Sequence, residues 1–253
     1  MNLTGPDPCH RICETNGTHS SHGLSNATRG DGTMNRFFVF GLGLFSMSTA
    51  PSLVQAQEEP SFDCSKAKSQ VEKVLCSGGD SGMGWIDQTM ADLYKAVRAA
   101  PGADAATLES SQRAWLAKRD HCKGSDEKVM NCLIDSYRGR YAELSSAYDQ
   151  KHLTGTYGNA RGVLDSVLFP DGNLLVNIST DVGAPSYDSC SVTFRAPLEG
   201  EAVQHVFTPE EIGADGQCTV DLKITGSQID VTPKDCRVFC GNSASFDGAY
   251  KKQ

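Results

Sequence analysis

The stretch Gln112-Arg-Ala-Trp-Leu-Ala-Lys-Arg-Asp-His-Cys122 is predicted to be the central part of a helix. Ala114, Trp115 and the pair Ala117–Lys118 are expected to lie on one face of that helix. The stretch ends in a cysteine followed by Lys-Gly, which is typical of a helix stop. A tryptophan in a small helical domain is usually a core anchor, because its large ring carries a polar N–H that needs one partner. The alternative interpretation of Trp115 is a contact residue for another molecule.

Three further helices are predicted around this stretch, which itself belongs to a helix from about residue 105 to residue 121. Ser69 and Glu72 form a capping-box pattern, so a short helix is expected to begin near Ser69. The other two helices are expected at residues 85–100 and from about residue 126. Their apolar stripes recur at three- and four-residue spacings and comprise Ile86, Met90, Leu93, Tyr94 and Val97 in one helix and Val129, Leu133, Tyr137, Tyr141 and Leu144 in the other. The charged side chains of the last helix are interpreted as a solvated face, consisting of Arg138, Arg140 and Glu143.

The pattern changes after residue 152, where short alternating runs separated by turn residues replace the helical spacing. Hairpin turns are predicted at residues 170–173 and 225–227. Segments 155–157 and 247–250 are expected to be edge strands that meet and close the sheet. Other strands are predicted at residues 162–169, 174–179, 191–195, 218–224 and 228–232. The predicted fold is therefore an all-α, disulfide-stapled helical domain followed by an all-β domain, a small antiparallel barrel or sandwich.

A secretory signal peptide is predicted at residues 34–56. It has a basic start at Met34-Asn35-Arg36, an apolar run at residues 37–44, and a small-x-small cleavage site at Val54-Gln55-Ala56. A transmembrane helix is disfavoured because the apolar run is short and is followed by serines and a proline. Residues 1–33 are interpreted as an artefact of a start codon assigned upstream of the true start at Met34. The alternative is a genuine disordered tail.

Two domains are expected to remain after cleavage, at residues 57–151 and 152–253. The exported chain is expected in the periplasm or outside the cell, without a membrane span. The sequence gives no indication of the oligomeric state.

Four cysteines lie in each predicted domain, and an even number in an exported protein indicates two disulfides per domain. In a continuous helix Cys64 and Cys76 would be about 18 Å apart, too far to bridge. Their pairing therefore requires the helix that begins near Ser69. Cys122 and Cys132 are placed to join the third predicted helix to the fourth.

The cysteines of the β-domain allow three pairings. The hairpin about Gly226 places Cys218 close to Cys236, which leaves Cys190 for Cys240. An alternative interpretation is that Cys236 and Cys240 together bind a metal ion. Disulfides are favoured because the chain is predicted to be exported and no second ligand pair follows at zinc-finger spacing.

No recognised catalytic pattern is found in the mature chain. Its histidines, His121, His152 and His205, belong to no metal or triad pattern. There is no Gly-x-Ser-x-Gly motif and no glycine-rich phosphate loop. We therefore predict a protein that is not an enzyme and has no cofactor.

Residues 62–148 resemble the lysozyme-inhibitor LprI-type domain, a small exported helical module of bacteria. The similarity rests on Phe62-Asp63-Cys64, Leu75-Cys76, Cys122, Cys132 and the segment from Gln112 to Leu116, together with Gln112, Trp115, Arg119, Tyr137 and Arg140. The resemblance implies a helical module and, from the family's name, lysozyme inhibition. It supplies no inhibitory motif, and the matching positions are expected mainly to hold the module together. The β-domain is assigned to no family.

Residues 152–253 contain 13 Asp and Glu against 7 Lys and Arg. This balance does not suit nucleic acid or an anionic membrane. It suits a basic partner, because opposite charge speeds association, and lysozymes are usually basic. A loop that enters a lysozyme cleft would meet catalytic carboxylates, so cationic groups are the candidate contacts: Arg195, Lys234 and Arg237.

Two functions follow from these observations. The first is an exported lysozyme inhibitor that acts by binding. The alternative is a non-inhibitory periplasmic interaction or ligand-binding module, in which the helices serve as a stapled scaffold. A hydrolase within the β-domain is a third, less favoured hypothesis.

Overall fold

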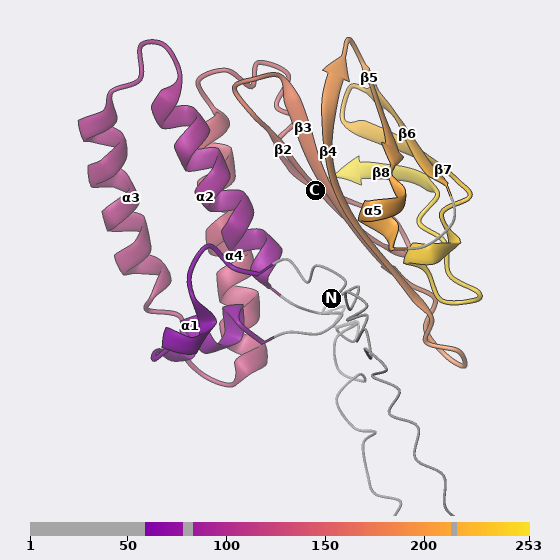
Figure 1. The fold of residues 1–253 in the computed structure, drawn as a ribbon, viewed down its shortest axis with the longest axis horizontal. Helices are drawn as coiled ribbons and strands as arrows, with labels where there is room; N and C mark the ends of the chain where they lie inside the picture. Colours follow the sequence, from indigo (N-terminus) through magenta and orange to yellow (C-terminus); the bar gives the residue numbers. More distant parts are fainter. Residues whose placement is uncertain (1–58, 78–82, 214–216) are drawn as a thin grey trace, which may run out of the picture. The chain divides into compact units, whose positions relative to one another are not determined.

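The computed structural model describes residues 59–77, 83–213 and 217–253. The predicted extension and signal peptide lie outside these residues. Within them, helices α1 to α4 come first and an eight-stranded antiparallel sheet follows (Figure 1). None of the described helices is long and apolar enough to cross a lipid bilayer.

The helices lie where the apolar spacing predicts them. They are α1 (Gln70–Leu75), α2 (Gly84–Ala99), α3 (Ala105–Arg119) and α4 (Asp126–Ser145), preceded by the short 3-10 helix η1 (Cys64–Lys66). Ser69 caps α1, and Glu72 accepts the backbone N–H of Ser69 in return, which is the predicted capping box. Asp104 and Ser125 cap α3 and α4 in the same way, by accepting backbone N–H groups of the first turn.

The face predicted for α3 is right for Trp115, which packs against the helical core, and wrong for its other members. Ala114, Ala117 and Lys118 are exposed, and α3 contains no fully buried residue. The side chains that turn toward the core are instead partly buried, at a three- to four-residue spacing: Leu108, Gln112, Trp115 and Arg119. Alanines carry too little apolar area to choose the face of a helix, whereas the long side chains gain most by contact with α4.

The solvated face predicted for α4 is right for Glu143, which is exposed, but wrong for Arg140, and Arg138 is half-buried. The Arg140 side chain is 1% exposed, donates to Gln112 Oε1 and Ser111 Oγ at 3.0 and 2.9 Å, and forms an ion pair with Glu143. Arg138 forms two hydrogen bonds with the carboxylate of Asp165. Both arginines lie between packed elements, a placement that depends on neighbours distant in sequence.

The second half forms a closed barrel. Its strands are β1 (Gly155–Gly158), β2 (Gly162–Leu168), β3 (Asn173–Asp181), β4 (Ser189–Glu199), β5 (Ala202–Phe207), β6 (Cys218–Thr225), β7 (Gln228–Lys234) and β8 (Gly248–Lys252). Each strand pairs antiparallel with the next, and β8 pairs with β1 through Tyr157↔Lys252 and Gly158↔Lys251. The two predicted edge strands therefore do close the sheet, and the fold is a barrel and not a sandwich.

Strand β5 was not predicted from the sequence. Its inward positions are Val203, His205 and Phe207, so a partly buried histidine occupies the middle of the apolar alternation. The short helix α5 (Pro209–Ile212) follows it and buries Ile212 in the barrel core.

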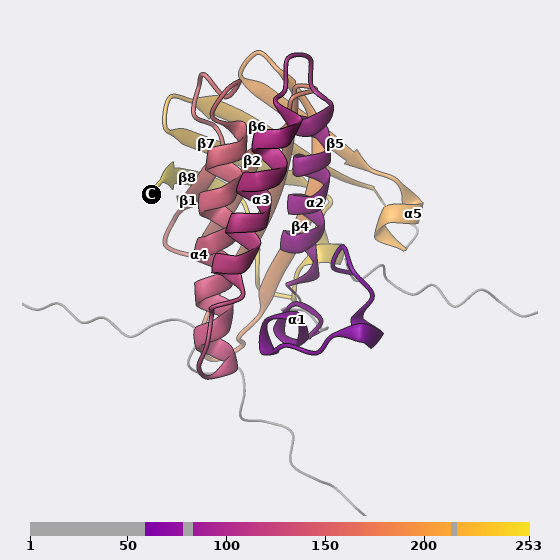
Figure 2. The same cartoon turned by 90° about the vertical axis from the view of Figure 1, so that its left-hand side faces the viewer.

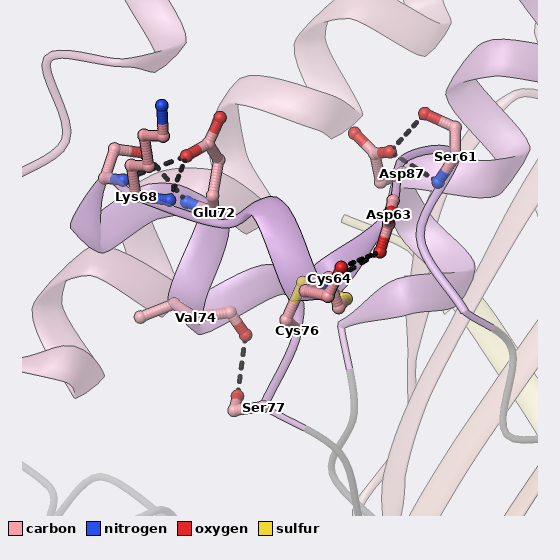
Figure 3. Close-up of a disulfide and its surroundings, with 11 residues drawn as sticks. Ser61, Asp63, Cys64, Lys68, Glu72, Val74, Cys76, Ser77 and Asp87 are labelled. Atoms are coloured by element: carbon pink, nitrogen blue, oxygen red, sulfur yellow. Dashed lines mark hydrogen bonds between the residues drawn. A yellow bond between two sulfur atoms is a disulfide. The ribbon is translucent and has the colours of Figure 1, made fainter.

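The structure contains the disulfide pairings that the sequence favours. They are Cys64–Cys76, Cys122–Cys132, Cys190–Cys240 and Cys218–Cys236. Figure 3 shows the first of them, in which the turn before α1 folds back and brings the two Cα atoms to 5.7 Å. Cys236 and Cys240 belong to different disulfides, which excludes the metal-pair interpretation.

Helices and barrel share one apolar cluster. Val167 and Phe169 from the β2 side of the barrel are buried in the same cluster as the inner faces of α1, α2 and α4. The Arg138–Asp165 pair lies beside this cluster, and Thr156 Oγ1 donates to Asp165 at 2.7 Å. The two parts are therefore joined by buried contacts as well as by the chain.

Replacing a buried arginine of the helices is predicted to lower the free energy of unfolding more than replacing an exposed one. Arg140→Ala is expected to lower the free energy of unfolding by about 3 kcal/mol, because it removes buried hydrogen bonds and leaves their partners unsatisfied. Arg113→Ala removes an exposed pair with Glu109 and is expected to cost about 0.5 kcal/mol or less. Urea denaturation of the oxidised chain measures both values, and equal costs would contradict the structural role of Arg140.

Candidate functional site

Two of the family-pattern residues of the helices, Arg119 and Tyr137, meet Asp87 in one buried network. Asp87 of α2 is 5% exposed and accepts from Tyr137 Oη of α4 at 2.5 Å. Arg119 of α3 donates to Tyr137 Oη at 3.0 Å and lies 3.4 Å from the Asp87 carboxylate. Ser61 donates to the other Asp87 oxygen through both its backbone N–H and its hydroxyl (Figure 3). The network therefore ties α2, α3 and α4 to the segment before η1.

Trp115 completes the contact between α3 and α4, which run side by side in Figure 2. Its ring meets the ring of Tyr137 edge to face at 5.0 Å, and its Nε1 donates to the backbone oxygen of Ser136 at 3.2 Å. The Arg119 guanidinium lies 5.6 Å from its ring centre. These contacts are those of a core anchor.

The polar groups in and around this network form hydrogen bonds with one another. Arg119 also binds Asp120 through two nitrogens, and Gln112 accepts from Arg140. Burial raises the pKa of Tyr137, and the adjacent Asp87 carboxylate raises it further. The arrangement fixes helices and presents no paired acid and base to a substrate.

Buried tyrosines predict an alkaline limit to stability. Burial raises the pKa of a set of tyrosines in both halves of the chain, Tyr137, Tyr141, Tyr148, Tyr157 and Tyr250. A folded-state pKa above the unfolded value of about 10 stabilises the protein below pH 10, and this contribution is lost as pH rises further. We expect tyrosinate absorbance from these residues to appear together with the loss of circular dichroism above about pH 10.

The exposed Tyr187 supplies the control for this titration. Tyr187→Phe should leave the pH of the unfolding transition unchanged. Full ionisation of all tyrosines before any loss of secondary structure would contradict the prediction.

The three cationic residues predicted as partner contacts lie in different surroundings. Arg195 projects outward from β4, binds the Asp171 carboxylate at 2.5 Å and covers the ring of Phe169 at 3.7 Å. Its charge is thus committed to the hairpin between β2 and β3. Lys234 and Arg237 are exposed at the end of β7 and in the 3-10 helix η2 (Arg237–Phe239), and no ion pair joins either one to another described residue.

Lys234 and Arg237 lie at the end of the barrel that carries most of the exposed large apolar side chains. In an antiparallel barrel, the loops after β3 and β7 leave from the same end. Val182 and Tyr187 occupy the loop after β3, and Val238 follows Arg237, with exposed fractions of 38%, 52% and 44%. We call the set Val182, Tyr187, Lys234, Arg237 and Val238 the barrel tip.

Internal bonds fix the conformation of the barrel tip. The Tyr187 N–H donates to Gly183 O at 2.8 Å, and the Val182 N–H donates to Asp188 O at 3.1 Å. The Asp188 carboxylate accepts the backbone N–H and the hydroxyl of Ser243, which joins the β3–β4 loop to the segment after η2. The Cys190–Cys240 disulfide also joins the start of β4 to the segment after η2. A surface held in this way loses little conformational entropy when it binds a partner.

The described residues contain no group of three or more side chains placed to hold a metal ion. His205 stacks on Phe194 with ring centres 5.1 Å apart, and its Nε2 lies 3.4 Å from a Glu211 carboxylate oxygen. His121 is exposed, and its Nδ1 lies 2.5 Å from Ala117 O. His205 therefore lies among the aromatic rings of the barrel, whereas His121 lies just after α3.

Comparison with known proteins identifies the helical part. Residues 64–151 match the model of a protein family described as Lysozyme inhibitor LprI. The match coincides with the helices and the first two disulfides, and it confirms the resemblance predicted for residues 62–148. This region is therefore similar to an LprI-type helical domain, and no family is assigned to the barrel. No curated protein and no solved structure matches the chain.

Proposed function

We propose that this chain is an exported lysozyme inhibitor that acts by binding and not by catalysis. The observation that carries the proposal is the match of residues 64–151 to a family named for lysozyme inhibition. Export to the periplasm or the cell exterior is supported by the four disulfides, which fit an oxidising compartment, and by the signal peptide predicted from the sequence.

The barrel tip is the surface that we propose for contact with lysozyme. It combines an exposed tyrosine and arginine with two valines, and aromatic residues and arginine are enriched at the energetic centres of interfaces. Lys234 and Arg237 offer cationic groups to the carboxylates of a glycosidase cleft. Arg195 is the weakest of the three predicted contacts, because Asp171 already neutralises its charge.

The alternative is a non-inhibitory interaction module. It is favoured by the use of the family-pattern residues: Trp115, Arg119 and Tyr137 bind one another and hold the helices, so the family pattern can persist without a lysozyme site. In that case the helices are a scaffold for whatever the barrel binds.

The first test is inhibition of egg-white lysozyme by the oxidised chain, with and without changes at the barrel tip. Arg237→Glu and Tyr187→Ser are each expected to raise the inhibition constant about tenfold or more, as for residues at the centre of an interface. Arg98→Glu is the matched control, because Arg98 is exposed on α2, and it should change the constant less than twofold.

Each outcome of this test decides one part of the proposal. Inhibition that both tip variants leave unchanged would reject the barrel tip and keep the inhibitor. Absence of inhibition across several lysozyme classes, with all four disulfides formed, would reject the inhibitor in favour of the interaction module. Association that slows steeply with added salt would support charge attraction between the acidic chain and a basic enzyme.

A further inference from the structure

The barrel has an opening between β4 and β5. Strand β4 pairs with β3 along its whole length, from Asp181↔Ser189 to Asn173↔Pro197. It pairs with β5 only beside their shared turn, at Leu198↔Val203 and Glu199↔Ala202. Figure 1 shows the two strands diverging from that turn.

The orientation of the backbone groups in β4 follows from two hydrogen bonds. The N–H of Leu198 donates to Gly172 O, toward β3, whereas Ser189 O accepts from Gly241 N on the other side. Because successive residues of a strand alternate, Ser191, Thr193 and Arg195 direct their N–H and C=O groups away from β3. The bridge Cys190↔Cys240 pairs the start of this edge, beside Ser191, with the segment after η2. No hydrogen bond from another described residue reaches the backbone groups of Thr193 and Arg195.

The same alternation applies to β5. Glu201 O accepts from Ile224 N, toward β6, so Gln204 and Val206 direct their backbone groups toward the opening. Two unpaired strand edges therefore face each other. The Val206 side chain, on β5, is 51% exposed.

Aromatic side chains join β4 to β5 where the ladder is missing. The ring of His205 stacks on Phe194 and meets Phe207 edge to face at 4.3 Å. Phe207 contacts Phe239 at 4.6 Å. The barrel interior is thus closed by side chains, while the backbone groups at the edges keep their capacity to bond.

The β5 side of the opening is acidic, whereas β4 carries Arg195, which is paired with Asp171, and Lys151 Nζ donates to Gly200 O at the shared turn. No Lys or Arg occurs between residues 196 and 222, and the acidic side chains exposed in this segment are Glu199, Glu201, Glu210 and Glu211. Like charges oppose the edge-to-edge pairing of two copies of this chain. They favour an occupant with Lys or Arg side chains.

We propose that the β4 edge at the opening binds an extended, basic segment of the partner protein by strand addition. Backbone hydrogen bonds to residues 191–195 would supply the affinity, Val206 an apolar contact, and the glutamates the preference for basic residues. This inference rests on the proposed function in so far as a basic lysozyme supplies the segment. The edge begins one residue after Cys190, which is bonded to Cys240, so it adjoins the barrel tip.

Hydrogen–deuterium exchange of the full oxidised chain tests the proposal directly. The amides of residues 193, 195, 204 and 206 are expected to exchange rapidly in the free protein. Bound egg-white lysozyme should slow exchange in β4 at least tenfold. Protection confined to the barrel tip or to α3 would overturn the proposal and leave the inhibitor in place.

Two variants separate backbone pairing from charge. Thr193→Pro removes an N–H that points away from β3, so it spares the β3–β4 ladder and should weaken binding about tenfold or more. Glu201→Lys should weaken binding several-fold at low salt, whereas Asp92→Lys, an equal charge change on the exposed side of α2, should not. Unchanged affinity in Thr193→Pro, with the fold intact by circular dichroism, would overturn strand addition.

A second probe keeps this test independent of lysozyme. If egg-white lysozyme does not bind, the proposed inhibition fails, and a synthetic peptide of alternating lysine and valine replaces it in the exchange experiment. Protection of β4 by this peptide, and not by a peptide of alternating glutamate and valine, would support the inference. Absence of protection by the basic peptide would reject it.

Discussion

The ion pair between Arg138 and Asp165 joins the two halves of the structure. Two hydrogen bonds of 2.9 and 2.8 Å connect α4 to β2, and the buried Val167 and Phe169 lie beside them. A helical module of this size buries little apolar area of its own. Its two disulfides and its apolar contact with the barrel supply further stability. Since α4 also carries Arg140 and Tyr137 toward the other helices, this one helix holds both the helical cluster and its contact with the barrel.

The buried polar residues of the helical domain hold its helices together. Asp87, Arg119 and Tyr137 satisfy one another in a buried site, where an unpaired member would be costly. A family pattern built from such residues identifies the fold more directly than the function. Groups that remain free to meet a partner are found on the barrel, at its tip and along the opening between β4 and β5.

At this opening the barrel is closed by side chains and not by backbone hydrogen bonds. Strands β4 and β5 separate after two residue pairs, and aromatic rings take the place of the missing backbone bonds. Most barrels remove all strand edges by pairing every strand along its length. Here part of a strand edge remains unpaired beside an acidic surface. Such an edge can pair with another copy of the chain unless like charges repel that copy or a partner covers the edge.

Local signals in the sequence are enough to predict most of the elements, the fold class and the disulfides. Capping residues, three- to four-residue apolar spacing, hairpin turns and cysteine positions are local signals, and they predict α1 to α4, most of the strands and the four cysteine pairs. Strand β5 was not predicted, because His205 interrupts the alternation of apolar and polar residues. Contacts between distant parts of the chain set which face of α3 turns inward, why Arg140 is buried and Arg138 half-buried, and why Lys234 and Arg237 share one end of the barrel with Tyr187. Those outcomes depend on partners far apart in the chain, since a charged side chain is buried only where the fold brings it hydrogen-bonding groups that local spacing does not reveal.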